Sequence, residues 1–192
     1  MPGASGQGRH LTHLHCRAVR AVCAFAAVSL DLAGSAQVLR RRSTLRPVDA
    51  STQPSPQSPV GGGCLCGAVR YEITRPLSAA RYCHCTHCQR RTGTAASANG
   101  LVPREGFSLL QGREQLRSYK PPTGVPKHFC SVCGSALFSA DPLSDQQVVV
   151  RLGTIDRDTG IRPSYRQFVD SAAPWEPIPE DGLPRYPRSA SE

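Results

Sequence analysis

Residues 62–72 read GGCLCGAVRYE and join a close pair of cysteines to a stretch in which apolar and polar side chains alternate. Between residues 68 and 73 the apolar side chains are Val69, Tyr71 and Ile73, separated by charged ones. Such alternation is typical of a β-strand that buries one face. The sequence therefore predicts that a strand follows directly after a pair of neighbouring thiols.

Further segments of strand type follow, each short and bounded by turn residues. They are residues 94–102, 107–110, 115–119, 136–139, 147–152 and 164–169. Residues 107–119 are typical of a hairpin that turns at residues 111–114. A long amphipathic helical period is missing, and at most residues 86–91 could wind a turn or two of helix. Many short strands at regular spacing favour an all-β sandwich or a partly open barrel.

Length and charge limit the kinds of protein this can be. A chain of 192 residues is enough for one domain with a core and too short for two substantial ones. Of the formal net charge of +9, residues 1–60 contribute +5, from seven Arg against two Asp. Later basic residues are scattered through sequence of mixed sign, whereas a nucleic-acid surface needs them clustered. Nucleic acid is therefore not expected as a partner.

The composition changes near Gly61. Residues 1–60 are basic and then Pro/Ser-rich, so we expect a disordered leader, a folded domain at residues 61–188 and a tail at residues 189–192. Residues 21–30 form a short apolar run with the outline of a signal peptide, which stays the alternative. The run contains Cys23, is followed at once by Asp31 and is too short to span a bilayer. Since export would place clustered thiols in an oxidising compartment, a cytoplasmic location without a membrane partner is favoured.

Seven of the nine cysteines fall into three close groups. The groups are Cys64 with Cys66, then Cys83, Cys85 and Cys88, then Cys130 with Cys133. Disulfide frameworks usually space cysteines apart so that loops can be closed, whereas CxC and CxxC groups bring sulfur atoms within reach of one ion. Metal binding in a reducing compartment is therefore expected in place of disulfides.

The first and last groups, CLCG at 64–67 and CSVCG at 130–134, can together supply four thiolates. Zinc prefers four ligands in a tetrahedron, and a glycine after each pair lets the backbone turn around the metal. We expect a closed structural zinc site that stabilises the fold and takes no part in catalysis. Its ligands would be Cys64, Cys66, Cys130 and Cys133.

The middle group, CHCTHC at 83–88, has three cysteines and no further pair to complete a four-thiolate set. A zinc ion held by three protein groups keeps its fourth position for water or substrate, as catalytic zinc does. His84 or His87 could instead supply a fourth ligand and make this site structural too. Three thiolates make zinc electron-rich, so an open site favours binding of an incoming thiol over hydrolysis. The expected catalytic residues are Cys83, Cys85 and Cys88.

Three arginines flank the middle group, namely Arg81, Arg90 and Arg91. A guanidinium group suits bidentate binding of carboxylates. These side chains are therefore expected to hold the carboxylates of an anionic thiol such as glutathione, and the alternative is an ordinary solvated basic turn.

The motifs resemble those of the glutathione-dependent formaldehyde-activating enzymes, a family also described as centromere protein V-like. The resemblance rests on residues 62–72, 83–88, 91–93 (RTG), 129–134 (FCSVCG), 174–175 (PW) and 181–184 (DGLP). It implies an Mss4-like β-sandwich of short antiparallel strands stapled by zinc. It also implies two zinc ions per chain, one structural at the four-cysteine set and one catalytic at the three-cysteine set.

The resemblance further implies a carbon–sulfur lyase that adds a small thiol, glutathione or similar, to a small aldehyde such as formaldehyde. Residues 166–168 (RQF) depart from a His-Ile-Trp-like segment of the family, and the small residues 95–99 (AASAN) replace a bulkier apolar stretch. If these positions line the pocket, the substrate differs, whereas Trp175 is expected to be a buried core anchor. The alternatives are a non-catalytic binding module and a carrier that does not accelerate adduct formation.

Overall fold

The computed structural model describes residues 50–140 and 146–190. Residues 1–49 of the expected leader, including its apolar run, lie outside this part, as do the last two residues of the expected tail. Among the described residues, no helix has the length and apolar character needed to cross a membrane.

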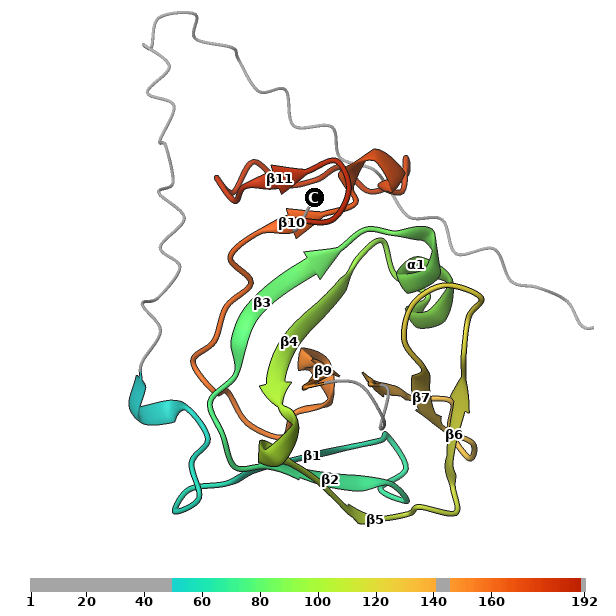
Figure 1. The fold of residues 1–192 in the computed structure, drawn as a ribbon. Helices are drawn as coiled ribbons and strands as arrows, with labels where there is room; N and C mark the ends of the chain where they lie inside the picture. Colours follow the sequence, from blue (N-terminus) through green and yellow to red (C-terminus); the bar gives the residue numbers. More distant parts are fainter. Residues whose placement is uncertain (1–49, 141–145, 191–192) are drawn as a thin grey trace, which may run out of the picture. The chain divides into compact units, whose positions relative to one another are not determined.

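The described chain consists of short strands with one short α-helix, so the all-β prediction is confirmed (Figure 1). The strands are β1 Val60–Gly63, β2 Arg70–Ile73, β3 Ser78–Cys83, β4 Ser97–Pro103, β5 Phe107–Gln111, β6 Leu116–Tyr119, β7 Lys127–Cys130, β8 Ala136–Ser139, β9 Gln147–Arg151, β10 Arg166–Gln167 and β11 Arg185–Tyr186. The helices are α1 Thr86–Thr92 and the 3-10 turns η1 Ala50–Thr52, η2 Arg104–Gly106, η3 Leu152–Thr154 and η4 Val169–Ser171.

The strands form two sheets. A three-stranded sheet has the order β1-β2-β5, and an eight-stranded sheet has the order β11-β10-β3-β4-β9-β8-β7-β6. Neighbours run antiparallel except at β10, which runs parallel to both β3 and β11. This exception brings the C-terminal part of the chain alongside the strand that ends at Cys83.

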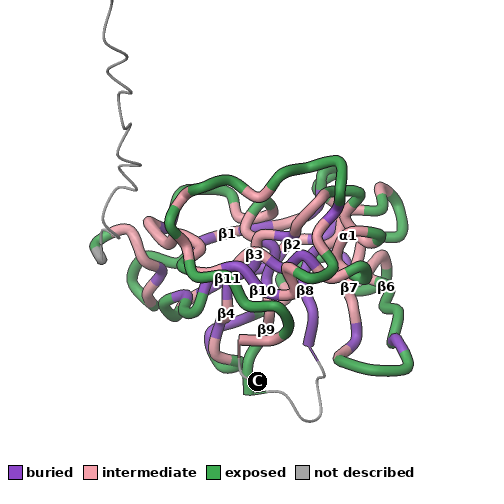
Figure 2. The backbone as a smooth tube through the Cα atoms, turned by 90° about the horizontal axis from the view of Figure 1, so that it is seen from above, coloured by how far each residue is buried: buried purple, intermediate pink, exposed green. Residues whose placement is uncertain are grey.

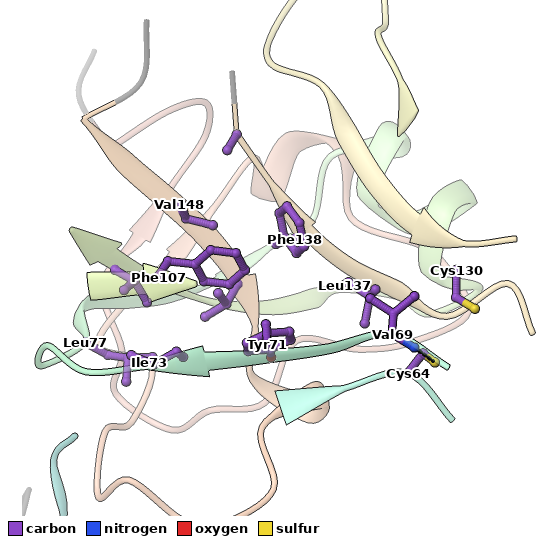
Figure 3. Packing of buried hydrophobic residues seen from close by; sticks show 13 residues of the cluster. Cys64, Val69, Tyr71, Ile73, Leu77, Phe107, Cys130, Leu137, Phe138 and Val148 are labelled. Atoms are coloured by element: carbon purple, nitrogen blue, oxygen red, sulfur yellow. Dashed lines mark hydrogen bonds between the residues drawn. The ribbon is translucent and has the colours of Figure 1, made fainter. Parts of the chain in front are cut away.

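The core lies between the two sheets (Figure 3). Val69, Tyr71 and Ile73 are fully buried, as the alternation in this strand predicts. The ring of Phe107 packs 5.1 Å from that of Tyr71 and 4.8 Å from that of Phe138, measured between centroids. Figure 2 shows buried positions gathered on the central strands and exposed ones mainly on the connections. Aromatic packing of this kind contributes beyond the burial of apolar area.

The prediction of a hairpin over residues 107–119 is wrong. β5 pairs with β2 in the small sheet, whereas β6 pairs with β7 in the large one. The chain does turn between them, and Gly112 has φ 80°. A Cβ atom there would collide with the carbonyl oxygen of Ala68, so glycine is needed for the close approach. The prediction paired two strands because they are adjacent in sequence, whereas in the structure each pairs with a different strand.

Residues 51–59, expected to be a solvated linker, contact the domain instead. Pro54 is fully buried, and the Gln53 side-chain oxygen accepts a hydrogen bond of 3.1 Å from the Leu77 amide. Arg157 donates a 2.8 Å hydrogen bond to the carbonyl of Thr52. Residues before the expected boundary at Gly61 therefore pack on the domain, and Gly61 itself lies within β1. A Pro/Ser-rich composition is shared by linkers and by extended segments that dock on a sheet.

We expect a chain that begins at Ala50 to be more stable than one that begins at Gly61, by about 2–4 kcal/mol. The shorter chain loses buried Val60, worth about 1.5–3 kcal/mol, and the Gln53 hydrogen bond, worth about 1 kcal/mol. Urea unfolding of both chains with equal zinc content checks this. Equal midpoints would show that residues 50–60 add nothing to stability.

Candidate metal centres

Four cysteines from distant parts of the chain meet at one end of the core. The Sγ atoms of Cys64, Cys66, Cys130 and Cys133 all lie within 4.8 Å of one another. The Cys64–Cys66 distance is 3.5 Å and the Cys66–Cys130 distance is 3.8 Å. A tetrahedral zinc site with Zn–S bonds of about 2.3 Å requires sulfur–sulfur distances of about 3.8 Å, whereas a disulfide requires about 2.05 Å. The donor set fits a four-thiolate metal site.

Backbone turns hold each half of this four-cysteine cluster. Gly67 and Gly134 adopt positive φ of 77° and 74°, and their amides donate to the carbonyls of the first cysteine in each pair. The hydroxyl and amide of Ser135 lower the pKa of the Cys133 thiol to about 5. A thiol must be deprotonated to bind a metal ion, so these hydrogen bonds favour the ligand form. The glycines that follow each motif have the role expected from the sequence.

A second cluster forms where β3 ends and α1 begins. The Sγ atoms of Cys83, Cys85 and Cys88 lie within 4.8 Å of one another, and Cys83 and Cys85 are 3.5 Å apart. Cys85 is the N-cap of α1, and its sulfur accepts the Cys88 amide at 3.4 Å. Gly93 ends the helix in the left-handed conformation, so the predicted one or two helical turns are confirmed. The end of β3 and the start of α1 thus bring the three sulfur atoms close together.

Neither histidine of the motif joins this three-cysteine cluster. Within residues 50–140 and 146–190, no His, Asp or Glu side chain lies close enough to be grouped with the three sulfur atoms. His84 is buried, and its Nε2 lies 3.4 Å from Nη1 of Arg166, while His87 is exposed. The chain as described therefore offers three ligands here and four at the other cluster.

The three-cysteine cluster is built to carry negative charge. Hydrogen bonds from the Cys83 and Cys88 thiols, together with backbone amides at the start of α1, lower the pKa of Cys85 to about 2. The hydrogen bonds that link Cys88 to Cys83 and Cys85 raise the pKa of Cys88. A thiolate at a helix N-terminus is also favoured by the helix dipole. A divalent cation with soft preferences suits this donor set.

Two cations beside this cluster were not foreseen, namely Arg151, which is buried, and Lys127, which is partly buried. Arg151 is only 7% exposed and donates to the side chains of Ser139, at 2.9 Å, and Asn99. Burial lowers the pKa of Arg151, and the negative charge of Cys88 acts in the opposite direction. The pKa of Lys127 on β7 is also lowered, first by burial and then by repulsion from Arg151. Cys88 again acts in the opposite direction. Since three thiolates and one divalent cation carry a net charge of −1, these cations offset that charge. In the sequence, the available signal for Arg151 was a charged residue directly after the apolar run VVV at residues 148–150.

The three flanking arginines differ in their surroundings. Arg91 donates to the carbonyls of His128 (2.5 Å) and Phe138 (3.2 Å) and to the Ser139 hydroxyl (3.3 Å). Arg81 donates to the carbonyl of Ala79 at 3.3 Å, and Arg90 is exposed. Arg91 therefore ties α1 to β7 and β8, and Arg90 is the flanking arginine best placed to meet a ligand from solvent.

Replacing Arg91 with methionine should lower the free energy of unfolding by about 2–4 kcal/mol, because two carbonyls and a hydroxyl lose a donor. Arg90→Ala is the matched control and should change it by less than about 0.5 kcal/mol. Urea unfolding measures both. A stable Arg91→Met protein with weakened glutathione affinity would instead support the sequence-based role of Arg91 as a ligand-binding residue.

A cavity of about 510 Å³ lies next to the three-cysteine cluster. Its walls are Tyr82 and His84, Arg166 on β10, residues 93–96 after α1 and residues 175–179. Trp175 lies on this cavity with 67% of its surface exposed, so the prediction of a buried core anchor is wrong. The Pro-Trp pair belongs to the connection between η4 and β11, which is not part of either sheet.

Comparison with known proteins finds matches to the part of the chain that holds both cysteine clusters. Residues 59–171 match the family model "Glutathione-dependent formaldehyde-activating enzyme". Relatives named "Putative glutathione-dependent formaldehyde-activating enzyme" come from Halomonas elongata (30% identity over 103 residues, 50% of this chain and 66% of that protein) and Penicillium rubens (28% over 95 residues, 47% and 50%). The chain thus spans about half to two thirds of the length of these relatives. A crystal structure of a Rhodobacter sphaeroides protein is 25% identical, with a TM-score of 0.42 over 54% of this chain and 91% of that one.

Proposed function

Because the chain belongs to the family of glutathione-dependent formaldehyde-activating enzymes, we propose that it adds glutathione, or a similar small thiol, to a small aldehyde such as formaldehyde. A carbon–sulfur bond forms, the carbonyl π bond opens, and the proton of the thiol ends on the former carbonyl oxygen. The reverse reaction breaks the carbon–sulfur bond, which places the activity among carbon–sulfur lyases.

The observation that carries the proposal is the three-cysteine cluster, which has no fourth protein ligand among the described residues. Zinc, when bound there, supplies a Lewis acid that lowers the pKa of an incoming thiol and fixes its position near the carbonyl. Cys83, Cys85 and Cys88 are the proposed ligands of this site, and the four-cysteine cluster is the proposed site of a second, structural zinc ion. The fit of both donor sets to zinc supports two ions per chain.

The surrounding residues support anionic chemistry at this site. Arg151 and Lys127 stabilise the negative charge that the thiolate of the incoming substrate, the fourth at this site, would add. Burial and the nearby Arg166 lower the pKa of His84, so this side chain is neutral at pH 7. No side chain in the described structure is assigned as general base, and solvent water is proposed to relay the thiol proton to the former carbonyl oxygen. Arg90, with Arg81, is proposed to contact the carboxylates of the thiol.

All seven cysteines of the described part are free thiols. A reducing compartment keeps them so and keeps them able to bind metal. This supports the proposal that the protein acts in the cytoplasm.

The test is the rate at which formaldehyde hydrate and S-(hydroxymethyl)glutathione exchange, measured by NMR exchange spectroscopy with the full chain under reducing conditions. We expect the exchange rate to rise in proportion to protein loaded with two equivalents of zinc. Adduct binding with an uncatalysed exchange rate would indicate a carrier instead. Absence of both thiol and adduct binding would indicate a non-catalytic module.

Zinc-edge X-ray absorption before and after adding glutathione gives an independent readout. Two zinc ions per chain, with mean sulfur coordination rising on addition, support the open site. Two ions that are already saturated, or one ion alone, contradict it.

A further inference from the structure

The cavity beside the three-cysteine cluster is larger than formaldehyde requires. Its volume of about 510 Å³ falls in the range of about 300–1,000 Å³ found for pockets that bind small organic molecules. Formaldehyde has a single carbon atom and leaves most of such a space unused. His84, which lines the cavity, stands between two of the clustered cysteines in the chain. The extra space therefore adjoins the proposed reaction centre.

The walls of the cavity are mainly apolar. Trp175, 67% exposed, and Ile178 stand on one segment, together with Pro177 and Pro179. Another segment contributes Gly93, Thr94 and the small side chains of residues 95 and 96, both alanine. An exposed tryptophan on a concave surface is typical of a site that binds a flat or branched apolar group. The alanines leave room for that group.

The charges that line the cavity do not suit a carboxylate. Arg166 is 6% exposed and already holds Asp181 at 2.6 Å, and its guanidinium carbon lies 4.5 Å from the ring centroid of Tyr82. The remaining Nε–H of Arg166 is buried and has no acceptor in the described structure. Glu176, which also lines the cavity, would repel an anion. A neutral ligand with one oxygen acceptor and an apolar body matches these walls.

We propose that this cavity binds the apolar substituent of the aldehyde, so that the preferred carbonyl substrate carries an aromatic or branched aliphatic group. The inference rests on the proposed function and names its substrate class. The thiol sulfur bonds to the carbonyl carbon, the π electrons move to the oxygen, and the oxygen takes up the thiol proton. The substituent takes no part in the bond changes and stays between Trp175 and the alanines.

The first test is binding, and it uses the fact that Trp175 is the single tryptophan of the chain. Titrating the full chain, loaded with zinc, with benzyl alcohol should give a saturable change in tryptophan fluorescence. Methanol at the same concentrations should give none. Ala95→Phe, which fills the cavity, should weaken benzyl alcohol binding at least about 10-fold. Leu110→Phe adds the same ring at an exposed site of the small sheet and should bind like the wild type.

The second test is substrate preference, measured as the ratio of kcat/KM for phenylacetaldehyde to that for formaldehyde with glutathione. The Ala95→Phe change should lower this ratio at least about 10-fold, and Leu110→Phe should leave it unchanged. A wild type that accelerates formaldehyde addition but ignores phenylacetaldehyde and benzyl alcohol overturns this inference and leaves the proposed function standing. A wild type that accelerates neither reaction contradicts the proposed function, and the fluorescence titration then decides on the cavity alone.

Discussion

Replacing Cys130 with serine is expected to lower the free energy of unfolding by at least about 4 kcal/mol and to remove one zinc ion per chain. Cys130 is fully buried, belongs to the hydrophobic core and ends β7. Its cluster joins the connection between β1 and β2 in the small sheet to β7 in the large sheet. Loss of the metal would therefore release one sheet from the other at that end of the core.

Thermal unfolding followed by circular dichroism, with elemental analysis of zinc in reducing buffer, checks this expectation. Val132→Ala is the matched control, because Val132 lies in the same turn, is exposed and should change stability by less than about 0.5 kcal/mol. A Cys130→Ser protein that keeps its midpoint and its zinc would show that the four sulfur atoms do not hold a structural ion.

Cys88→Ser should leave the domain folded, lower the zinc content by one ion per chain and reduce the exchange rate at least about 100-fold. The three-cysteine cluster lies outside the hydrophobic core, so the loss of its metal leaves the packing between the sheets in place. The expected change in stability is small beside that of Cys130→Ser. NMR exchange spectroscopy and zinc analysis on the same sample measure both quantities.

His87→Ala serves as the control for Cys88→Ser and decides between an open and a closed site. Because His87 is exposed and lies outside the three-cysteine cluster, its removal should leave the zinc content unchanged. Loss of zinc in this variant would mean that the histidine is a fourth ligand. If Cys88→Ser and Cys130→Ser lose stability equally, the division into structural and open sites is wrong.

The cysteine clusters could be predicted from the sequence because their chemistry is local. Each motif brings two or three thiols within a few residues, and the glycines after Cys66 and Cys133 adopt the positive φ that such turns need. Helix α1 was foreseen for a similar reason, since it begins within the motif itself. What a motif cannot encode is the set of distant residues that surrounds it. Arg151 on β9 interacts electrostatically with the three-cysteine cluster, and no spacing of residues in the chain predicts this interaction.

The strands show the same limit. β2 was found because one of its faces is buried and the pattern repeats every second residue. β1, with the sequence VGGG, was missed because glycine is unfavourable in strands. It is tolerated here because a Cβ at Gly62 would occupy the place of the Tyr71 ring. The false hairpin over residues 107–119 arose because alternation reveals a strand but not its partner.

The parallel pairing of β10 with β3 has a consequence for the order in which the protein is made. Arg166 and His84, which meet across this pairing, are 82 residues apart in the chain. On the ribosome, every residue of the four-cysteine cluster is synthesised before β10, so that cluster can take up metal while the C-terminal part is still being translated. The cavity acquires its Trp175 wall later still, because Trp175 follows β10 in the chain. Newly made chains would thus hold the sulfur atoms of both cysteine clusters before the segment that walls the cavity beside the three-cysteine cluster has been synthesised.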